Sequence, residues 1–178
     1  MRRKFIVLDC RMGLNIFLII VIIVVDQWTK KVVVGSFNLY DSVAVIDGFF
    51  NITYVLNPGA AFGFLAKMSD QYRVAFFVGV TIIAIAIVVY LLIKEKTIVL
   101  RRYAYSLIFA GAVGNLIDRI TVGKVIDFLD FYVGKYHWPA FNVADISITI
   151  GVGLLILDML LEKKKVSINA SQDIKNIG

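Results

Sequence analysis

Cysteine and histidine are scarce in this sequence, and their scarcity excludes several kinds of site. The only cysteine is Cys10, so neither an intramolecular disulfide nor a cluster of thiolate metal ligands can form. The only histidine is His137, and the chain has no Gly-x-Ser-x-Gly motif, which argues against a Ser–His hydrolase. It also has no His-Glu-x-x-His or Cys-x-x-Cys spacing and no phosphate-binding glycine loop. We therefore expect no metal ion and no other cofactor.

Charged residues are also few. Asp, Glu, Lys and Arg make up 18% of the 178 residues, whereas 60% are hydrophobic, and the mean hydropathy is +0.83. A soluble domain of this size is not so apolar, so lipid must be the main solvent of the chain. The net charge of +6 does not indicate nucleic-acid binding, because Lys and Arg beside apolar segments more often set membrane orientation. We expect no nucleic-acid partner.

Four apolar segments predict a membrane all-α fold, a bundle of four transmembrane helices. They cover about residues 12–33, 73–93, 99–120 and 142–161, and a bilayer core requires roughly 20 residues per helix. The clearest is Val74–Ile93, which is 20 residues long and carries no charge. The third is rich in small residues, which allow close helix packing. We expect one integral membrane domain over residues 1–165, followed by a disordered cytoplasmic tail over residues 166–178.

Lys and Arg are unequally distributed between the two sides of this predicted bundle. With four spans, both termini share one side with the loop between the second and third spans. That side holds 12 of the 19 Lys and Arg residues: Arg2, Arg3, Lys4, Arg11, Lys94, Lys96, Arg101, Arg102, Lys163, Lys164, Lys165 and Lys175. The positive-inside rule then predicts that both termini are cytoplasmic and that the two long loops face outward.

Two segments of the outward loops have the composition of β-strands. Phe49–Val55 and Val125–Tyr132 are rich in β-branched and aromatic residues, and Asn57-Pro58-Gly59 marks a turn. We expect a small extracytoplasmic β-sheet and loop region on the outer ends of the helices.

Eight polar side chains map to the outer halves of the spans or to the outer loops. They are Asp26, Asn57, Asn115, Asp118, Arg119, Asp127, Asn142 and Asp145. Each alone could be an ordinary interfacial residue, and the asparagines could be helix caps, because residues near a helix end can reach water. Several carboxylates at one level are harder to explain in this way, because like charges repel unless something uses or neutralises them. This grouping favours a functional site.

Carboxylate chemistry is the chemistry that these residues support. Two aspartates held close together cannot both ionise cheaply, so one keeps a proton while the other is anionic. Such a pair can take a proton from water and donate one to a carbonyl oxygen, which hydrolyses a peptide bond without a metal. Asp118, Asp127 and Asp145 are all candidates, and their spacing alone does not select two of the three.

Five short blocks follow one another along the chain with a characteristic order and spacing. They are Asp26-Gln27-Trp28-Thr29-Lys30, Asn57-Pro58-Gly59-Ala60-Ala61-Phe62, Gly114-Asn115-Leu116-Ile117-Asp118-Arg119, Val125-Ile126-Asp127-Phe128 and Phe141-Asn142-Val143-Ala144-Asp145. Together they resemble the signature blocks of bacterial lipoprotein signal peptidase, or signal peptidase II, over about residues 13–161. The resemblance implies a multi-pass aspartic endopeptidase of the bacterial inner membrane, with its active site at the outer face. Its substrates would be prolipoproteins, cut just before a diacylglyceryl-modified cysteine.

The resemblance also implies roles for single residues. The catalytic pair would be Asp127 and Asp145. The substrate pocket would be lined by Asn57, Gly59, Asn115, Arg119 and Asn142, and structural support would come from Asp26, Lys30 and Asp118. In that arrangement the neighbouring charge of Arg119 would hold Asp118 ionised and make it a poor proton shuttle. The chain departs from the family pattern at Ile146, where members usually have serine. Its partners would be the prolipoproteins and membrane lipid, with the enzyme acting as a monomer.

Two other classes of function compete with a peptidase. A small transporter subunit could use Asp26, Asp118 and Asp145 as a proton or cation path, but such a path requires charges through the depth of the membrane, and the centre of every predicted span is apolar. A non-catalytic assembly factor would tolerate replacement of both catalytic aspartates by asparagine, which a peptidase would not.

Overall fold

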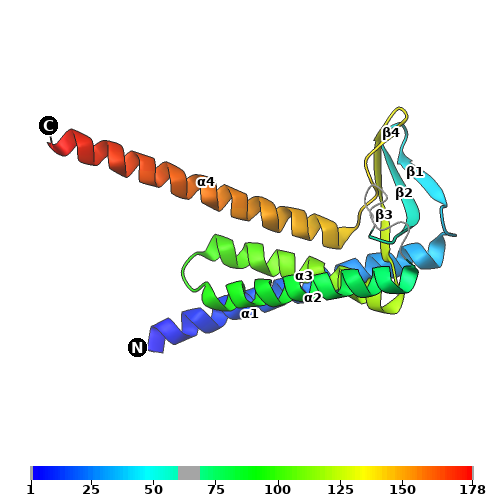
Figure 1. Cartoon of the computed structure of the whole chain (residues 1–178), viewed down its shortest axis with the longest axis horizontal. Helices are drawn as coiled ribbons and strands as arrows, with labels where there is room; N and C mark the ends of the chain where they lie inside the picture. Colours follow the sequence, from blue (N-terminus) through cyan, green and yellow to red (C-terminus); the bar gives the residue numbers. More distant parts are fainter. Residues whose placement is uncertain (1, 60–68, 178) are drawn as a thin grey trace.

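A bundle of helices with a small sheet at one end makes up the computed structural model, which describes residues 2–59 and 69–177. The elements run α1 (Arg2–Ser36), β1 (Ser42–Ile46), β2 (Phe50–Asn57), α2 (Asp70–Lys94), α3 (Val99–Thr121), β3 (Val125–Val133), β4 (Tyr136–His137) and α4 (Val143–Ile177). Figure 1 shows the sheet at one end of the helices and both chain termini at the opposite end. Ala60, Ala61 and Phe62 of the second signature block lie outside the described residues.

The helices are long and apolar, as the sequence predicts. Within the described residues, three of them are long and apolar enough to cross a membrane: Met12–Ser36, Asp70–Lys94 and Val143–Lys163. Helix α3 is not among these three; it is less apolar, with charged residues near both ends and small and polar residues between them. The fold is therefore that of a membrane protein with several apolar helices and a small sheet, and the fourth crossing stays a prediction.

The sheet is antiparallel with the strand order β1-β2-β3-β4. Its two central strands, β2 and β3, cover the segments predicted to be strands, so that expectation is confirmed. Their register pairs Val55 with Asp127 and Asn57 with Val125, and the rings of Phe50 and Phe131 stack on one another, with centroids 4.6 Å apart. This pairing fixes the end of β2 beside the first residues of β3, where Asp127 lies.

Glycines allow α3 and α4 to approach closely. A methyl group added at Gly111 would collide with the carbonyl oxygen of Ala144, and one added at Gly151 would lie 2.7 Å from the carbonyl oxygen of Ala104. The hydroxyl of Ser147 on α4 donates a hydrogen bond to the carbonyl of Leu107 on α3, at 2.8 Å. Close packing through small residues is confirmed, and it brings the start of α4 against the last turns of α3.

Two helices extend beyond the segments that hydropathy indicates. Helix α1 begins at Arg2, well before residue 12, and α4 continues to Ile177, through the segment that the sequence predicts to be a disordered tail. Hydropathy marks only the part of a helix that lies in hydrocarbon, whereas backbone hydrogen bonding can continue into the polar interface. The domain boundary at residue 165 stays a prediction.

Candidate active site

Most of the polar residues that the sequence singles out meet at the sheet end of the bundle, together with Gln27. We call this group the sheet-end cluster; its members are Asp26, Gln27, Lys30, Asn57, Asn115, Asp118, Asp127, Asn142 and Asp145. Five of its side chains are at most 2% exposed: those of Asp26, Lys30, Asp118, Asp127 and Asn142. In the part of the chain that the structure describes, no buried side-chain nitrogen or oxygen is without a hydrogen-bond partner. The cluster is thus a fully connected polar network, the only form in which such burial is stable.

Lys30 lies between α1 and α3, among the buried residues of the cluster. Its ammonium group is 2.8 Å from Asp26 Oδ2 and 2.8 Å from Asp118 Oδ2, and it donates to Asn115 Oδ1 at 3.1 Å. The three N–H donors of the ammonium therefore face three acceptors, one from α1 and two from α3. One buried cation offsets half of the charge of the two buried carboxylates, and it ties α1 to α3.

Asp26 and Asp118 each hold a backbone N–H group next to another aspartate. Asp26 Oδ1 accepts from the N–H of Ala144 at 2.9 Å, and Asp118 Oδ2 accepts from the N–H of Ile126 at 3.1 Å. Ala144 directly precedes Asp145, and Ile126 directly precedes Asp127. The two supporting carboxylates thus fix the backbone from which the two remaining carboxyl groups project.

Asn142 bridges those two remaining carboxyl groups. Its side-chain amide donates to Asp127 Oδ1 at 2.6 Å, while its backbone N–H donates to Asp145 Oδ2 at 3.2 Å. Its own Oδ1 accepts from the backbone N–H of Asp145 at 2.9 Å. The exchange between Asn142 and Asp145 is a capping box at the start of α4. Asn142 therefore acts both as a helix cap and as part of the site.

Asn115 connects Lys30 to Asp145 through hydrogen bonds. Its Nδ2 group donates to Asp145 Oδ1 at 2.8 Å, while its Oδ1 accepts from Lys30 at 3.1 Å and from Asn142 Nδ2 at 3.2 Å. Because two donors face the amide oxygen, the amide nitrogen must face Asp145. Lys30 therefore sets the orientation of a donor that stabilises a negative charge on Asp145.

Asn57 and Gly59 come from the end of β2. Asn57 Nδ2 donates to Asp127 Oδ2 at 2.9 Å, and Asn57 Oδ1 accepts from the N–H of Gly59 at 2.8 Å. Gly59 has a φ of 84°, and a methyl group added there would lie 2.7 Å from the ring of Phe77. Only glycine fits this turn, and the turn aims the Asn57 amide at Asp127.

The two bridged carboxyl groups have different surroundings. Burial raises the pKa of Asp127 to about 7, and the nearby charge of Asp145 acts in the same direction, against the hydrogen bonds from Asn57 and Asn142. Asp145 is only half-buried and lies in the first turn of α4, where the helix dipole favours an anion. The raised pKa lets Asp127 hold a proton near neutral pH, as a general acid requires.

Arg119 does not pair with Asp118 as the sequence predicts. Asp118 pairs with Lys30, while Arg119 donates to the carbonyl oxygen of Asn115 at 3.3 Å and lies over the ring of Phe77, 5.7 Å from its centroid. Successive residues on a helix point about 100° apart, so adjacent charges face different neighbours. Sequence adjacency therefore indicated the wrong partner for Asp118.

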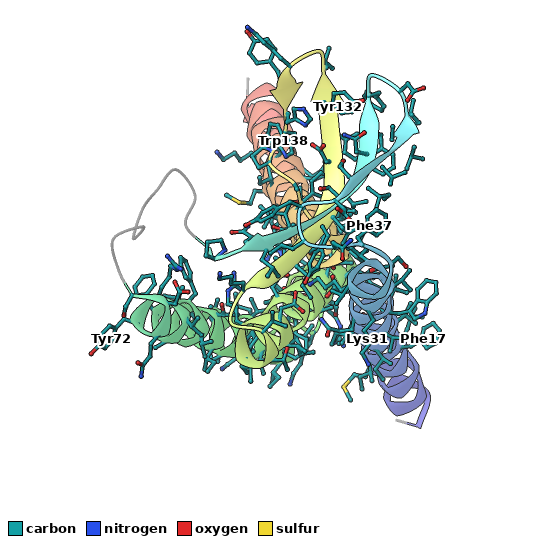
Figure 2. All side chains as sticks on the ribbon, turned by 90° about the vertical axis from the view of Figure 1, so that its right-hand side faces the viewer. Phe17, Lys31, Phe37, Tyr72, Tyr132 and Trp138 are labelled. Carbon is teal, nitrogen blue, oxygen red and sulfur yellow. The ribbon has the colours of Figure 1, made fainter. Side chains whose placement is uncertain are left out.

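An apolar groove of about 460 Å³ opens beside Asp145. It is lined by Trp138, Pro139, Ala140, Phe141, Asp145, Ile146, Thr149 and Ile150. Figure 2, which views the molecule from the sheet end, shows Trp138 near α4, and Tyr72 and Phe17 projecting outward from α2 and α1. Ile146, which departs from the family pattern, is 37% exposed and lines this groove. The site thus reaches apolar surface on one side of the carboxyl pair.

Sequence reasoning missed two residues that contact the site, Gln27 and Phe77. Gln27 donates to Asp118 Oδ1 at 3.0 Å, and Phe77 supports both Gly59 and Arg119. Gln27 stands inside the first signature block, which was a signal, whereas nothing in the apolar second span distinguishes Phe77. His137 lies outside the cluster, because its ring nitrogen faces Asp130 Oδ1 at 2.8 Å.

Fold and site together define a membrane enzyme in which paired carboxyl groups lie at one end of a bundle of apolar helices. A solved structure described as a bacterial membrane enzyme determined by the in meso method at 2.3 Å resolution superimposes with a TM-score of 0.76. It is 39% identical in sequence, over 86% of this chain and 91% of that one. A second such structure, at 1.9 Å resolution, is 38% identical with a TM-score of 0.74, over 83% of this chain and 93% of that one.

Sequence comparison specifies the family. The family described as signal peptidase (SPase) II matches residues 18–161. The lipoprotein signal peptidase of Syntrophus aciditrophicus is 52% identical over 82% of this chain and 91% of its own length. That of Geobacter sulfurreducens is 49% identical over 80% of this chain and 89% of its own length. The chain belongs to the signal peptidase II family and is a bacterial membrane peptidase of the aspartic type.

Proposed function

We propose that Asp127 and Asp145 are the catalytic pair of this peptidase. Ionised Asp145 accepts a proton from a water molecule as the water oxygen attacks the scissile carbonyl carbon, and protonated Asp127 donates its proton to the carbonyl oxygen. Asp145 then passes the proton to the leaving nitrogen as the C–N bond breaks, and Asp127 takes back a proton from the gem-diol hydroxyl as the C=O bond reforms. The observation that carries this proposal is the bridge of Asn142, whose side-chain amide donates to Asp127 Oδ1 at 2.6 Å and whose backbone N–H donates to Asp145 Oδ2 at 3.2 Å.

Neighbouring residues, inside and outside the sheet-end cluster, hold this pair and the substrate. The lining of the pocket consists of Asn57, Gly59, Asn115, Arg119 and Asn142. The three asparagines orient the carboxyl groups, and the guanidinium of Arg119 supplies positive charge near both. Structural support comes from Asp26, Lys30 and Asp118, which stabilise the backbone next to the catalytic pair. This division agrees with the contacts of the cluster, because the supporting residues bond to N–H groups adjacent to the catalytic residues.

The substrate is the signal peptide of a prolipoprotein, cut just before a diacylglyceryl-modified cysteine. Lipoprotein processing is the activity that the family and the named relatives share. A groove with apolar walls beside Asp145 suits a substrate whose scissile bond adjoins both lipid chains and an apolar helix. The enzyme works as a monomer in lipid.

All four helices cross the membrane in this proposal. Glu95–Ile98 is a short link between α2 and α3, and β3, which follows α3, pairs with β2, which precedes α2. If α2 crosses, α3 must therefore return to the sheet end, and its 23 residues are long enough to do so at about 1.5 Å each. The excess of Lys and Arg at the other end puts both termini in the cytoplasm of a bacterial cell, with the sheet and active site at the outer face of its inner membrane. One domain over residues 1–165 contains all of these parts.

Cleavage of matched substrates tests the substrate class. Purified enzyme in lipid bicelles is given a diacylglyceryl-modified prolipoprotein, or the same protein with serine in place of the modified cysteine. We expect cleavage of the modified substrate alone, with a lipid-bearing new N-terminus detected by mass spectrometry, and no change of rate with EDTA. Equal cleavage of both substrates would contradict the proposed specificity, and strong inhibition by EDTA would contradict the metal-free mechanism.

Labelling of single cysteines tests the orientation. In a variant with Cys10→Ser, Lys135→Cys should react with a membrane-impermeant maleimide added outside cells whose outer membrane has been opened. Lys96→Cys should react only after the inner membrane is also permeabilised. The reverse pattern would place the site in the cytoplasm.

A further inference from the structure

An apolar groove lies at the end of the bundle opposite the active site. It has a volume of about 520 Å³, within the roughly 300–1,000 Å³ of small-molecule sites. Its lining comes from α1, the end of α2, the link after it and the start of α3: Met12, Asn15, Ile16, Ile19, Leu92, Ile93, Lys96 and Arg102. Beside the groove, the membrane-compatible helix α2 ends at Lys94. The groove therefore lies at a membrane–water boundary, with isoleucine and leucine walls and two cations beside them.

The two neighbouring arginines at the start of α3 have different partners. Arg101 pairs with Asp158, Glu162 and Glu95. The guanidinium of Arg102 faces neutral oxygens: the Asn15 amide, turned so that its oxygen faces Arg102, accepts from Nη2 at 3.0 Å and from Nε at 3.1 Å. The carbonyl of Glu95 accepts from Nη1 at 3.3 Å. Among the ion pairs of the described residues, none includes Arg102, and its fixed positive charge lines the groove.

Asn15 holds the guanidinium of Arg102 in place without neutralising its charge, because the Asn15 amide is uncharged. It is 6% exposed, and its bidentate contact holds one edge of the guanidinium plane against α1. Lys96, which is exposed, adds a second cation at the same rim. Because a guanidinium and an ammonium group both recognise phosphate, the rim has the chemistry of a phosphate site above an apolar groove.

We propose that this groove binds one anionic phospholipid, with an acyl chain along Ile16, Ile19 and Leu92 and the headgroup phosphate beside Arg102 and Lys96. Charge complementarity selects the lipid: two cations without a described carboxylate partner favour a headgroup with net negative charge over a zwitterionic one. In the orientation proposed above, the lipid comes from the cytoplasmic leaflet. The site is separate from peptide cleavage, and lipid binding can be measured without it.

Native mass spectrometry of the purified protein tests this site. The protein, in a neutral detergent, is mixed with equal amounts of phosphatidylglycerol and phosphatidylcholine, and the bound lipids are counted. We expect one phosphatidylglycerol to be retained in preference to phosphatidylcholine. Arg102→Gln should weaken that preference about fivefold, since one basic residue near a lipid surface contributes about 1 kcal/mol. Lys96→Gln should weaken it in the same direction and does not disturb a packed residue.

Two control variants distinguish lipid binding in the groove from general electrostatic attraction to the protein surface. Lys94→Gln removes one positive charge from the same end of the protein, but Lys94 lies over the ring of Tyr90 and does not line the groove; it should keep the preference. Ile16→Trp fills the groove and should reduce binding of both lipids. Equal effects of Lys94→Gln and Arg102→Gln, or unchanged binding in Ile16→Trp, would overturn the proposal. Loss of phosphatidylglycerol on addition of millimolar inorganic phosphate would also overturn it, because it would indicate a site for phosphate alone.

Discussion

Two groups of charged residues join the helices, one at each end of the bundle, and they differ in burial. In the sheet-end cluster, the side chains of Lys30, Asp26 and Asp118 are 0–2% exposed. In the loop-end cluster, which consists of Arg101, Glu95, Asp158 and Glu162, the side chains are 11–53% exposed. Both groups tie α3 to another helix, but only in the first are all the charged groups removed from solvent; in the second, Asp158 alone is buried.

This difference in burial indicates what each group contributes. Exposed ion pairs contribute about 0–1 kcal/mol each, so the loop-end cluster is a modest brace. Buried pairs gain little over apolar packing, although removing one partner is strongly destabilising. A buried cation beneath two carboxylates is therefore explained better by the positions it enforces than by stability. Each of those carboxylates holds the N–H group just before Asp127 or Asp145.

The largest expected effect is on cleavage, from changes to the catalytic pair. Asp127→Asn and Asp145→Asn should each lower kcat by about 10⁴-fold with the fold intact, because each removes a general acid or base without changing shape. Rates on lipid-modified prolipoprotein measure the effect, and circular dichroism checks the fold.

Asp130→Asn is the matched control for that effect. Asp130 is a buried acid on the same strand, but it faces His137 and Asn51, and its change should leave cleavage within about threefold. Asp118→Asn should lose stability and keep part of the activity. If the Asp118→Asn variant were folded but inactive while the Asp127→Asn variant kept its activity, the proposed catalytic pair would be wrong.

The next effect is on stability and contrasts the two ends directly. Lys30→Met leaves Asp26 and Asp118 buried without their cation, and it should lower the free energy of unfolding by about 3–5 kcal/mol. Arg101→Met removes the central cation of the loop-end cluster, and it should cost about 1 kcal/mol. Thermal unfolding in one detergent compares them. Similar losses in the two variants would mean that burial does not distinguish the clusters.

A smaller effect is expected from adding one methyl group. Gly114→Ala on α3 would place the new carbon 2.6 Å from Asp26 Oδ2, whereas Gly153→Ala on α4 would meet nothing within 4 Å. We expect a loss of about 1–3 kcal/mol from the first change and none from the second. The same unfolding measurement checks both variants. If Gly114→Ala did not lower the free energy of unfolding, the side chain of Asp26 would be free to move.

The smallest effect is a shift in pH dependence. Asp127, whose pKa is raised to about 7, must be protonated to donate, so kcat/KM should fall as the pH rises through that value. The hydrogen bond from Asn57 stabilises the carboxylate and lowers its pKa. Asn57→Ala should therefore raise the pKa of Asp127 and move the alkaline limb of the profile to higher pH. A limb that moves to lower pH would contradict Asp127 as the acid.

The fold followed from the sequence to a large extent, because its signals are local. Apolar length indicated the helices, β-branched and aromatic runs indicated β2 and β3, and small residues indicated the close contact of α3 with α4. Apolar length supports the predicted crossing of α3 less strongly than the other three, because Arg101 and Asp118 lie within that helix.

The site followed less completely, because its contacts join residues that are far apart in the chain. Motif resemblance named the members, but sequence adjacency paired Asp118 with Arg119, and the fold pairs it with Lys30, 88 positions away. No local pattern could show that Asp26 accepts from the N–H of Ala144, 118 positions away. The function of Asn142 as both cap and bridge also depends on where β3 lies.

The central claim, that the sheet-end cluster holds Asp127 and Asp145 on either side of a peptide bond, is tested most directly by a crystal structure. Asp127→Asn should trap an uncleaved, lipid-modified signal peptide in the site. We predict that the scissile carbonyl oxygen lies within hydrogen-bond distance of residue 127 and that a water beside Asp145 faces the carbonyl carbon. A scissile bond bound instead against Asp118, or away from the cluster, would contradict the account.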